Sequence, residues 1–204
     1  MDKPVFNNKQ NPKYSTKDGI RWHSRACAVV VHVWCQYVNV KGETITYVLV
    51  GKRGTGGDNI GLLNIPCGYM DWNENLEQAS RREVWEETGL NIEKYYDKAA
   101  VSNLDQPWFV NSALSENRQN IAMHTAFVFV LNESEGDKMP ELTSEYSEKN
   151  EVEELYWMNI EDVIQSQSSL WAFNHRERVI QFLHLITHTV QNNELEELDE
   201  KEDI

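Results

Sequence analysis

The chain has 204 residues, which is enough for one substantial domain with a buried core, and 40% of them are hydrophobic. Its formal net charge is −14, and residues 191–204 supply −6 of it through seven acids and one lysine. Nucleic acids and membrane surfaces are anionic, so an acidic chain is a poor candidate for binding either one nonspecifically. We therefore expect neither nucleic acid nor membrane as a partner.

The three cysteines, Cys27, Cys35 and Cys67, form no CxxC pair. This odd number without metal-binding spacing argues against a disulfide scaffold or a zinc knuckle and favours a reduced compartment. The polar N-terminus has no apolar core of a secretory signal, and no apolar run approaches the roughly 18 residues of a membrane span. The sequence thus predicts a cytoplasmic protein.

Residues 1–20 are polar and predict an N-terminal arm. Two β-branched, apolar segments follow and predict strands, with a hairpin turn around Gly42 between them. A glycine-rich segment comes next, but it lacks both GxxxxGK[ST] and GxGxxG, so we interpret it as a connection between strands. A short strand-like piece ends this part of the chain. The ranges are 26–35 and 44–52 for the strands, 51–61 for the connection and 62–67 for the last piece.

A helix is predicted from Asn75 to Thr88, because Asn75 and Gln78 have the spacing of a capping box and Gly89 suits a C-terminal stop. A last helix should open at Asn174 and bury an apolar stripe made of Val179, Phe182, Leu183, Ile186 and Val190. Strands at 99–104, 121–131 and 152–158, a short helix at 160–165, and loops at 105–120 and 132–150 complete the chain. We therefore expect one mixed α/β (α+β) domain over 21–190, followed by an acidic tail at 191–204.

Three glutamates of the predicted helix, Glu83, Glu86 and Glu87, fall within about 100° of one another on a helical wheel. They continue the face that begins with Leu76, Ala79 and Ser80, which should pack on the protein, whereas Gln78, Arg81 and Trp85 lie opposite. Partly buried carboxylates this close need a counterion. Arg82 is available for one, and oxygen-only ligands suit Mg²⁺ or Mn²⁺. On the carboxylates alone, a solvated acidic face remains the alternative.

The stretch from Gly68 to Leu90 can be written GX5EX7REUXEEXGU, with U an aliphatic residue. This pattern resembles the Nudix box at every defined position, and Glu154–Val163 resembles a further segment common in that family. The resemblance implies a mixed β-sheet sandwiched between helices, in which the box forms a loop–helix–loop. It also implies an enzyme that hydrolyses a nucleoside diphosphate linked to another group, a small-molecule partner.

The resemblance also assigns roles to the matching residues. It implies metal ligation of Mg²⁺ or Mn²⁺ by the Gly68 carbonyl and by the four glutamates of the box, with Arg82 orienting them as part of the catalytic machinery. The general base varies in this family. Glu86 of the box and Glu151, Glu153 and Glu154 outside it are the candidates, and Glu154 is taken with Glu86 and Glu87 as catalytic. The four box glutamates are Glu74, Glu83, Glu86 and Glu87.

One position differs from many family members. Pro66-Cys67-Gly68 stands where they have PGG. A small residue in a tight position is one interpretation of Cys67. Isopentenyl diphosphate isomerases share the fold and carry a catalytic cysteine just before the equivalent glycine, which makes an isomerase the less favoured alternative because the box here is intact.

Substrate choice depends on weaker signals. Pro107 lies 17 residues after Leu90, a spacing similar to that of the ADP-ribose-hydrolysing group, so ADP-ribose or a related nucleotide sugar is favoured. Trp108 and Phe109 are candidates for stacking a base, and Arg118 is a candidate for contacting phosphate or ribose. The histidines are most simply structural; those concerned are His23, His32, His124 and His175.

A non-enzymatic alternative is a Nudix-like sensor that binds a nucleotide without cutting it. Regulators of that kind usually add a basic DNA-binding extension, whereas about 45 residues follow Met158 here and they end in an acidic stretch. The intact glutamates also favour catalysis. Because Nudix proteins are often dimers, a homodimer remains open.

Overall fold

A mixed sheet of eight strands forms the centre of the protein, and β3 and β9 are its longest strands. The computed structural model describes residues 13–22, 27–115, 118–147 and 150–187. The strand order is β10-β4-β3-β9-β7, with β5 beside β4, β6 beside β3 and β8 beside β9. The strands are β3 (Cys27–Val38), β4 (Thr44–Arg53), β5 (Leu63–Asn64), β6 (Cys67–Tyr69), β7 (Ala99–Asn103), β8 (Phe109–Ser115), β9 (Arg118–Asn132) and β10 (Val152–Asn159).

The middle of the sheet is the parallel pair β3 and β9, which stay in register from Cys27 beside Ile121 to Val38 beside Asn132. Both strands are rich in valine and aromatic residues, which pack well on a pleated surface that is covered on both faces. The predicted turn after β3 is confirmed: Gly42 has φ 79°, and its N–H donates to the Asn39 carbonyl over 2.9 Å.

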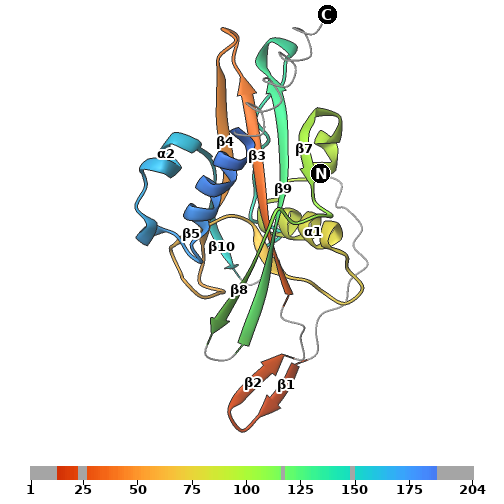
Figure 1. Ribbon diagram of the computed structural model, residues 1–204, viewed down its shortest axis with the longest axis vertical. Coiled ribbons are helices and arrows are strands. Elements are labelled where there is room, and N and C mark those ends of the chain that lie inside the picture. The colour runs from red at the N-terminus through yellow and green to blue at the C-terminus, as the bar shows by residue number, and fades with distance from the viewer. Residues whose placement is uncertain (1–12, 23–26, 116–117, 148–149, 188–204) are drawn as a thin grey trace, which may run out of the picture.

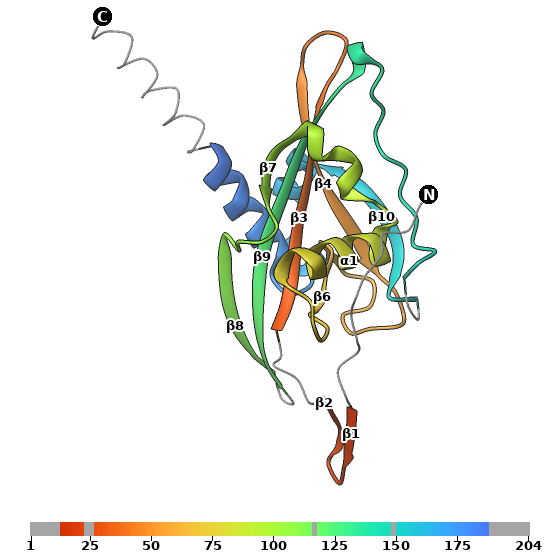
Figure 2. The same ribbon diagram turned by 90° about the vertical axis from the view of Figure 1, so that its right-hand side faces the viewer.

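Helices cover both faces of this sheet, as Figures 1 and 2 show. On one face lies α1 (Leu76–Thr88), and on the other lie α2 (Ile160–Gln165) and a C-terminal helix over residues 175–187. The predicted capping box at Asn75 and the stop at Gly89, with φ 67°, are both present. Short 3-10 helices join the elements, among them η1 (Ile92–Lys98), η2 (Glu133–Glu135) and η4 (Ser168–Leu170). The predicted α+β architecture with a sandwiched sheet is confirmed.

The alternation of side chains along β3 divides the core into two clusters. Val29, Val31 and Val33 face α1, whereas Val30 and Trp34 face the C-terminal helix. Val179 and Phe182 of that helix are buried, as its apolar stripe predicts, and Val190 of the stripe lies outside the described residues. The sheet therefore separates two environments that bury different side chains.

Three expectations about local structure need correction. The predicted loop over 105–120 contains β8, which pairs with β9 from Phe109 beside His124 to Ser115 beside Arg118. Its polar sequence hid the strand because β8 lies at the edge of the sheet. The described part of the predicted arm is a hairpin of its own, β1 (Lys13–Thr16) and β2 (Gly19–Trp22), beyond the end of the main sheet in Figure 1.

The third correction concerns Trp85, which was expected on the outer side of α1 and is fully buried. Its ring stacks on that of Tyr146, with centroids 4.8 Å apart. Tyr146 belongs to the segment that follows η2, and this segment descends beside α1 in Figure 2. The loop thus covers the helix face that a wheel drawn on α1 alone assigns to solvent.

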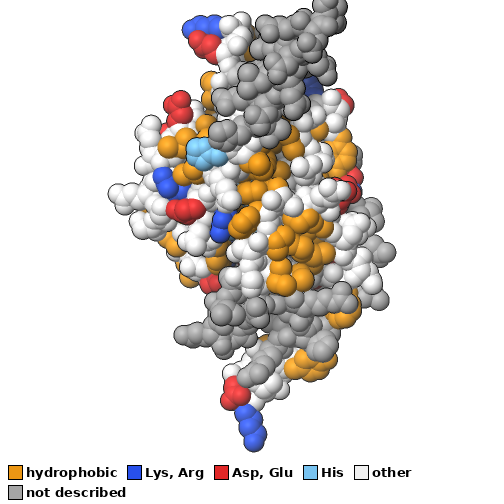
Figure 3. Space-filling view, in the orientation of Figure 1, with side chains coloured by type: hydrophobic (Ala, Val, Ile, Leu, Met, Phe, Trp, Pro, Cys, Tyr) orange, Lys and Arg blue, Asp and Glu red, His pale blue; other side chains and the backbone are white. Residues whose placement is uncertain are grey.

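Part of the sheet surface is apolar and reaches solvent. Val110 is 50% exposed and Ile121 is 41% exposed, on β8 and β9. Figure 3 shows hydrophobic side chains gathered around these strands, with few charged groups among them. Among the helices of the described chain, none is long and apolar enough to cross a membrane.

Candidate active site

Arg82 is the centre of the box, and its guanidinium binds three carboxylates. Glu74 takes two bonds, 2.7 Å from Nε and 2.9 Å from Nη2, and Nη1 donates to Glu83 over 2.6 Å and to Glu86 over 3.1 Å. Nη2 also donates to the Tyr69 carbonyl over 2.8 Å. The side chains of Arg82 and Glu74 are only 6% and 2% exposed. Because charge-assisted, bidentate bonds fix geometry, Arg82 holds the segment from Tyr69 to Glu74 against α1.

Glu83 and Glu87 connect α1 to the short strand β6. The Cys67 N–H donates to Glu87 Oε2 over 3.2 Å. A Cβ at position 68 would overlap the Glu83 carboxylate, so only glycine lets the two elements approach this closely. Gly68 therefore serves the site through its lack of a side chain.

Burial changes the pKa of Glu83 and of Glu87 more than their neighbouring groups do. Burial raises the pKa of Glu83 to about 7, although Arg82 opposes the shift. Burial, followed by the charge of Glu83, raises the pKa of Glu87 well above its ordinary value. Burial works against the charge of Arg82, but its bonds with Glu74 and Glu83 outweigh burial and raise its pKa. The cluster therefore holds more negative charge than one guanidinium offsets.

The donor set fits a divalent cation. Glu74, Glu83, Glu86 and Glu87 supply four carboxylates against the one charge of Arg82, and the bonds described above occupy one oxygen each of Glu83, Glu86 and Glu87. Oxygen-only ligands on a rigid helix suit Mg²⁺ or Mn²⁺, which compensates the remaining charge. Within the described ranges, no group of three or more histidine, cysteine, aspartate or glutamate side chains is arranged to hold a metal ion. The fit thus depends on donor chemistry and charge.

The candidate general bases differ in position. Glu154 is exposed on β10, where Lys52 Nζ lies 2.8 Å from its Oε1, and this bond lowers its pKa, with Tyr156 adding to the effect. Glu151 precedes β10, and its carbonyl accepts the Gly54 N–H over 2.7 Å. Its charge is among those that raise the pKa of Glu87, whereas the charge of Glu154 is not among the main contributors. Of these two candidates, Glu151 therefore has the larger electrostatic effect on the box.

Two of the three predicted substrate residues, Trp108 and Phe109, lie on the face opposite α1. Trp108 packs in the core, with its ring centroid 5.1 Å from that of Phe182. Phe109 is half-buried, and Arg178 places its guanidinium carbon 4.1 Å from the centroid of that ring. Arg118 opens β9, but its side chain lies outside the described ones.

Two features escaped the sequence reasoning. His32, His124 and His175 gather in the core, and Arg178 of the C-terminal helix lies near them. The signal for the first was the inward alternation of His32 and His124 on strands that were correctly predicted. Arg178 gave no signal, because its partner Phe109 lies on a strand that was interpreted as a loop.

The environment of Cys67 disfavours its thiolate form. Burial, followed by the charge of Glu87, raises its pKa, and thiolates are the nucleophilic form. Asn64 Nδ2 lies 3.6 Å from its sulfur. Cys35 and Cys67 are free thiols. The environment of Cys67 favours the small-residue interpretation.

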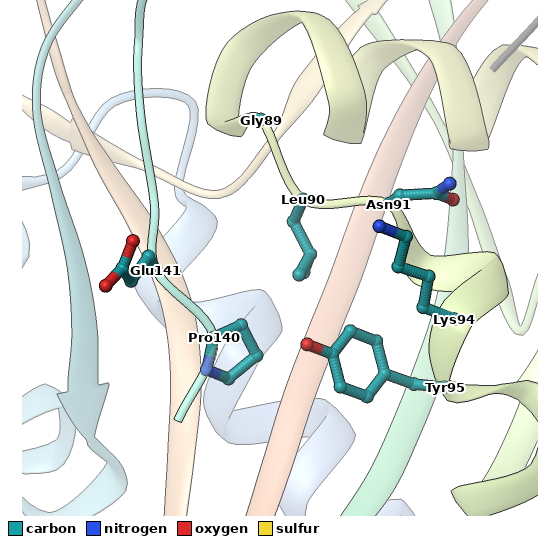
Figure 4. A pocket seen from close by; sticks show the side chains of 7 residues that line it. All are labelled: Gly89, Leu90, Asn91, Lys94, Tyr95, Pro140 and Glu141. Carbon is teal, nitrogen blue, oxygen red and sulfur yellow. The ribbon is translucent and has the colours of Figure 1, made fainter. Parts of the chain in front are cut away.

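A separate pocket of about 100 Å³ lies beyond the C-terminal end of α1 (Figure 4). It is smaller than the roughly 300 Å³ at which ligand pockets begin. Its lining contains one acid and no residue that binds Arg82, so it is distinct from the carboxylate cluster. The lining residues are Gly89, Leu90, Asn91, Lys94, Tyr95, Pro140 and Glu141.

The NUDIX domain family matches residues 29–198, and the chain belongs to this family. The match covers the box, the sheet and the C-terminal helix. Together with the intact box, it makes the chain a Nudix hydrolase, an enzyme acting on phosphoanhydride bonds.

Solved structures share the fold at low sequence identity. A Nudix hydrolase from M. smegmatis, RenU, is 17% identical with a TM-score of 0.55, over 88% of this chain and 96% of that one. The NUDIX domain of Shewanella oneidensis NrtR, complexed with ADP ribose, is 15% identical with a TM-score of 0.50, over 80% and 89%. A bifunctional NMN adenylyltransferase/ADP ribose pyrophosphatase from Francisella tularensis, complexed with AMP and a Mn ion, is 18% identical with a TM-score of 0.51, over 75% and 41%.

Proposed function

We propose that this Nudix hydrolase cleaves a nucleoside diphosphate linked to another moiety, with ADP-ribose or a related nucleotide sugar as substrate and Mg²⁺ or Mn²⁺ as cofactor. The observation that carries the proposal is the cluster of carboxylates around Arg82, which faces the backbone of β6 and holds more negative charge than its arginine offsets. The ADP ribose bound to one similar structure, and the ADP ribose pyrophosphatase among the others, support the substrate.

In this proposal the Gly68 carbonyl, Glu74, Glu83, Glu86 and Glu87 hold the metal. A divalent ion held by these residues would supply charge to neutralise phosphate oxygens and would lower the pKa of a bound water. Arg82 positions the glutamates through its bonds to three of them. Phe109 offers its half-buried ring to the base, and Arg118 remains a candidate for a phosphate or ribose contact.

The base that takes the proton of the attacking water is assigned to Glu151 in place of Glu154. Glu151→Gln removes this group and should lower kcat by roughly 10²- to 10⁴-fold. Glu154→Gln is the matched control, since it makes the same change three residues along on an exposed side chain, and should keep kcat within about twofold. Equal losses in both variants, or a loss confined to Glu154→Gln, would reverse the assignment.

The function itself is tested by a product assay with Mg²⁺ or Mn²⁺ on ADP-ribose, other nucleotide sugars, dinucleoside polyphosphates, NADH and oxidised dNTPs. We expect metal-dependent release of AMP and ribose 5-phosphate from ADP-ribose, lost in Glu87→Gln. Absence of turnover on every substrate, with tight nucleotide binding retained, would contradict hydrolysis and favour a sensor. Turnover of isopentenyl diphosphate that depends on Cys67 would favour the isomerase.

The setting of the enzyme also belongs to the proposal. We infer a cytoplasmic location from the free thiols of Cys35 and Cys67, because disulfides are rare in reducing compartments. Size-exclusion chromatography with light scattering distinguishes a monomer from the homodimer that the family resemblance leaves open.

A further inference from the structure

The sheet face opposite α1 carries a chain of polar side chains across three neighbouring strands. His124 on β9 has its Nδ1 3.2 Å from Nε2 of His32 on β3. Its Nε2 lies 3.1 Å from Oδ1 of Asn111 on β8. The two histidines are buried, and Asn111 is half-buried at the sheet edge. The chain thus leads from the core to the surface.

The direction of these hydrogen bonds follows from the chemistry of the groups. An amide oxygen only accepts, so Nε2 of His124 donates to Asn111. Burial, with the charge of Arg178, lowers the pKa of His124 to about 4, so the ring is neutral and its Nδ1 accepts from His32. The Asn111 oxygen is thereby held toward the core, and the two N–H groups of its amide remain for a ligand.

A flat apolar surface lies beside this amide. Phe109 precedes Asn111 by two residues, so both side chains share one face of β8, and its ring lies 5.4 Å from that of His124. Arg178 covers the Phe109 ring at 4.1 Å. Guanidinium and aromatic planes both stack on planar rings. A planar ligand with hydrogen-bond acceptors on its edge matches this combination.

A second observation marks the same place. Two polar atoms at the buried end of the chain, His32 Nδ1 and Trp108 Nε1, make no hydrogen bond among the described residues, and their rings lie 5.0 Å apart. Most buried donors and acceptors in folded proteins are paired, so each unpaired one calls for an explanation. Leaving these two buried atoms unpaired costs free energy of folding, and packing of the core alone does not require that cost.

The sheet register connects this place to the box. Tyr69, whose carbonyl Arg82 binds, pairs with Ala28 on β3; Ala28 pairs with Ala122 on β9, and Ala122 with Asn111 on β8. Three strand spacings separate Tyr69 from Asn111, which amounts to about 14 Å. Both alanines between them are small and partly exposed. The span is on the scale of an extended nucleotide from its diphosphate to its base.

We propose that Phe109, Asn111 and Arg178 bind the nucleobase of the substrate, with His124 and His32 holding the Asn111 amide in place. The proposal rests on the proposed function and adds to it the site that selects a base with acceptors on its edge.

The test measures binding of AMP, GMP, CMP and UMP to the full-length protein by calorimetry in metal-free buffer, with ribose 5-phosphate as the baseless probe. These probes contain no diphosphate to cleave, so the measurement is independent of turnover. Asn111→Asp keeps an oxygen for His124 and removes both N–H donors, and Arg178→Ala removes the stacked cation. Lys41→Ala, an exposed cation on the turn after β3, is the matched control.

We expect at least one nucleoside monophosphate to bind the wild type at least about tenfold more tightly than ribose 5-phosphate. Asn111→Asp and Arg178→Ala should each weaken that binding by about tenfold, with ribose 5-phosphate and Lys41→Ala unchanged. Equal binding of the nucleotides and ribose 5-phosphate, or wild-type affinity in both variants, overturns the base site. Base-dependent binding without hydrolysis of any substrate overturns the proposed function alone.

Discussion

On the α1 side of the sheet, three carboxylates bind the guanidinium of Arg82 and Glu87 lies near Glu83, whereas on the opposite side three histidines are buried near Arg178. Both regions remove titratable groups from water, but they do so differently. The first gathers acids around a single guanidinium and needs a further cation to keep them all ionised, and the second gives up its charge and relies on neutral hydrogen bonds. The difference predicts opposite responses to substitution, metal and pH.

The largest expected effect comes from Arg82→Ala. Removing the guanidinium leaves Glu74 and Glu83 buried without their cation, which should lower the free energy of unfolding by about 3–5 kcal/mol. Urea denaturation in metal-free buffer measures the change. Arg81→Ala is the neighbouring control: Arg81 pairs with Glu93 near the surface, and its loss should cost less than about 1 kcal/mol. Similar losses in the two variants would show that the cluster does not depend on its counterion.

Metal binding should stabilise the protein through the α1 side of the sheet alone. At a Mg²⁺ or Mn²⁺ concentration of about 100 times its Kd, binding to the folded state adds about 2.7 kcal/mol to the free energy of unfolding. Glu87→Gln should lose most of this gain. Glu77→Gln makes the same change of charge in the first turn of α1, outside the Arg82 cluster, and should keep it. A gain that survives in Glu87→Gln would place the ion elsewhere.

The two regions also differ in what their sequences reveal. The box could be predicted residue by residue, because its chemistry lies within 23 positions and local capping at Asn75 and Gly89 places it on one helix. The site opposite α1 takes Phe109, His124 and Arg178 from three distant segments. A helical wheel and a strand pattern describe one element at a time, so contacts made by sheet register and helix packing stay hidden.

The buried histidines predict that the free energy of unfolding decreases at acidic pH. Burial, followed by the charge of His124, lowers the pKa of His175 from 6.5 to about 3. The unfolded chain binds a proton below pH 6.5 and the folded chain does not, so the stability from a neutral His175 is complete above pH 6.5 and is lost as pH falls toward 3. At pH 5 the loss amounts to about 2 kcal/mol, at 1.36 kcal/mol for each unit.

His175→Asn tests this dependence, since its amide oxygen replaces Nδ1 as acceptor for the Ile65 N–H. The difference in unfolding free energy between wild type and variant should shrink by about 2 kcal/mol between pH 7 and pH 5. The glutamates of the box titrate in both proteins and cancel in this difference. A difference that stays constant with pH would mean that His175 is not held neutral.

The smallest expected effect concerns the loop that covers α1. Thr143 N–H donates to the Thr88 carbonyl over 3.0 Å, and Tyr146 stacks on Trp85 with ring planes 20° apart, so this loop completes the wall behind the carboxylates. Tyr146→Ala should lower the free energy of unfolding by about 1 kcal/mol, and Tyr146→Phe, which keeps the ring, should leave it unchanged. The stack was invisible in the sequence because 60 residues separate its two partners along the chain. If Tyr146→Ala unfolds at the wild-type urea concentration, Trp85 is buried by α1 and the sheet alone, and the charged site needs no cover from the loop.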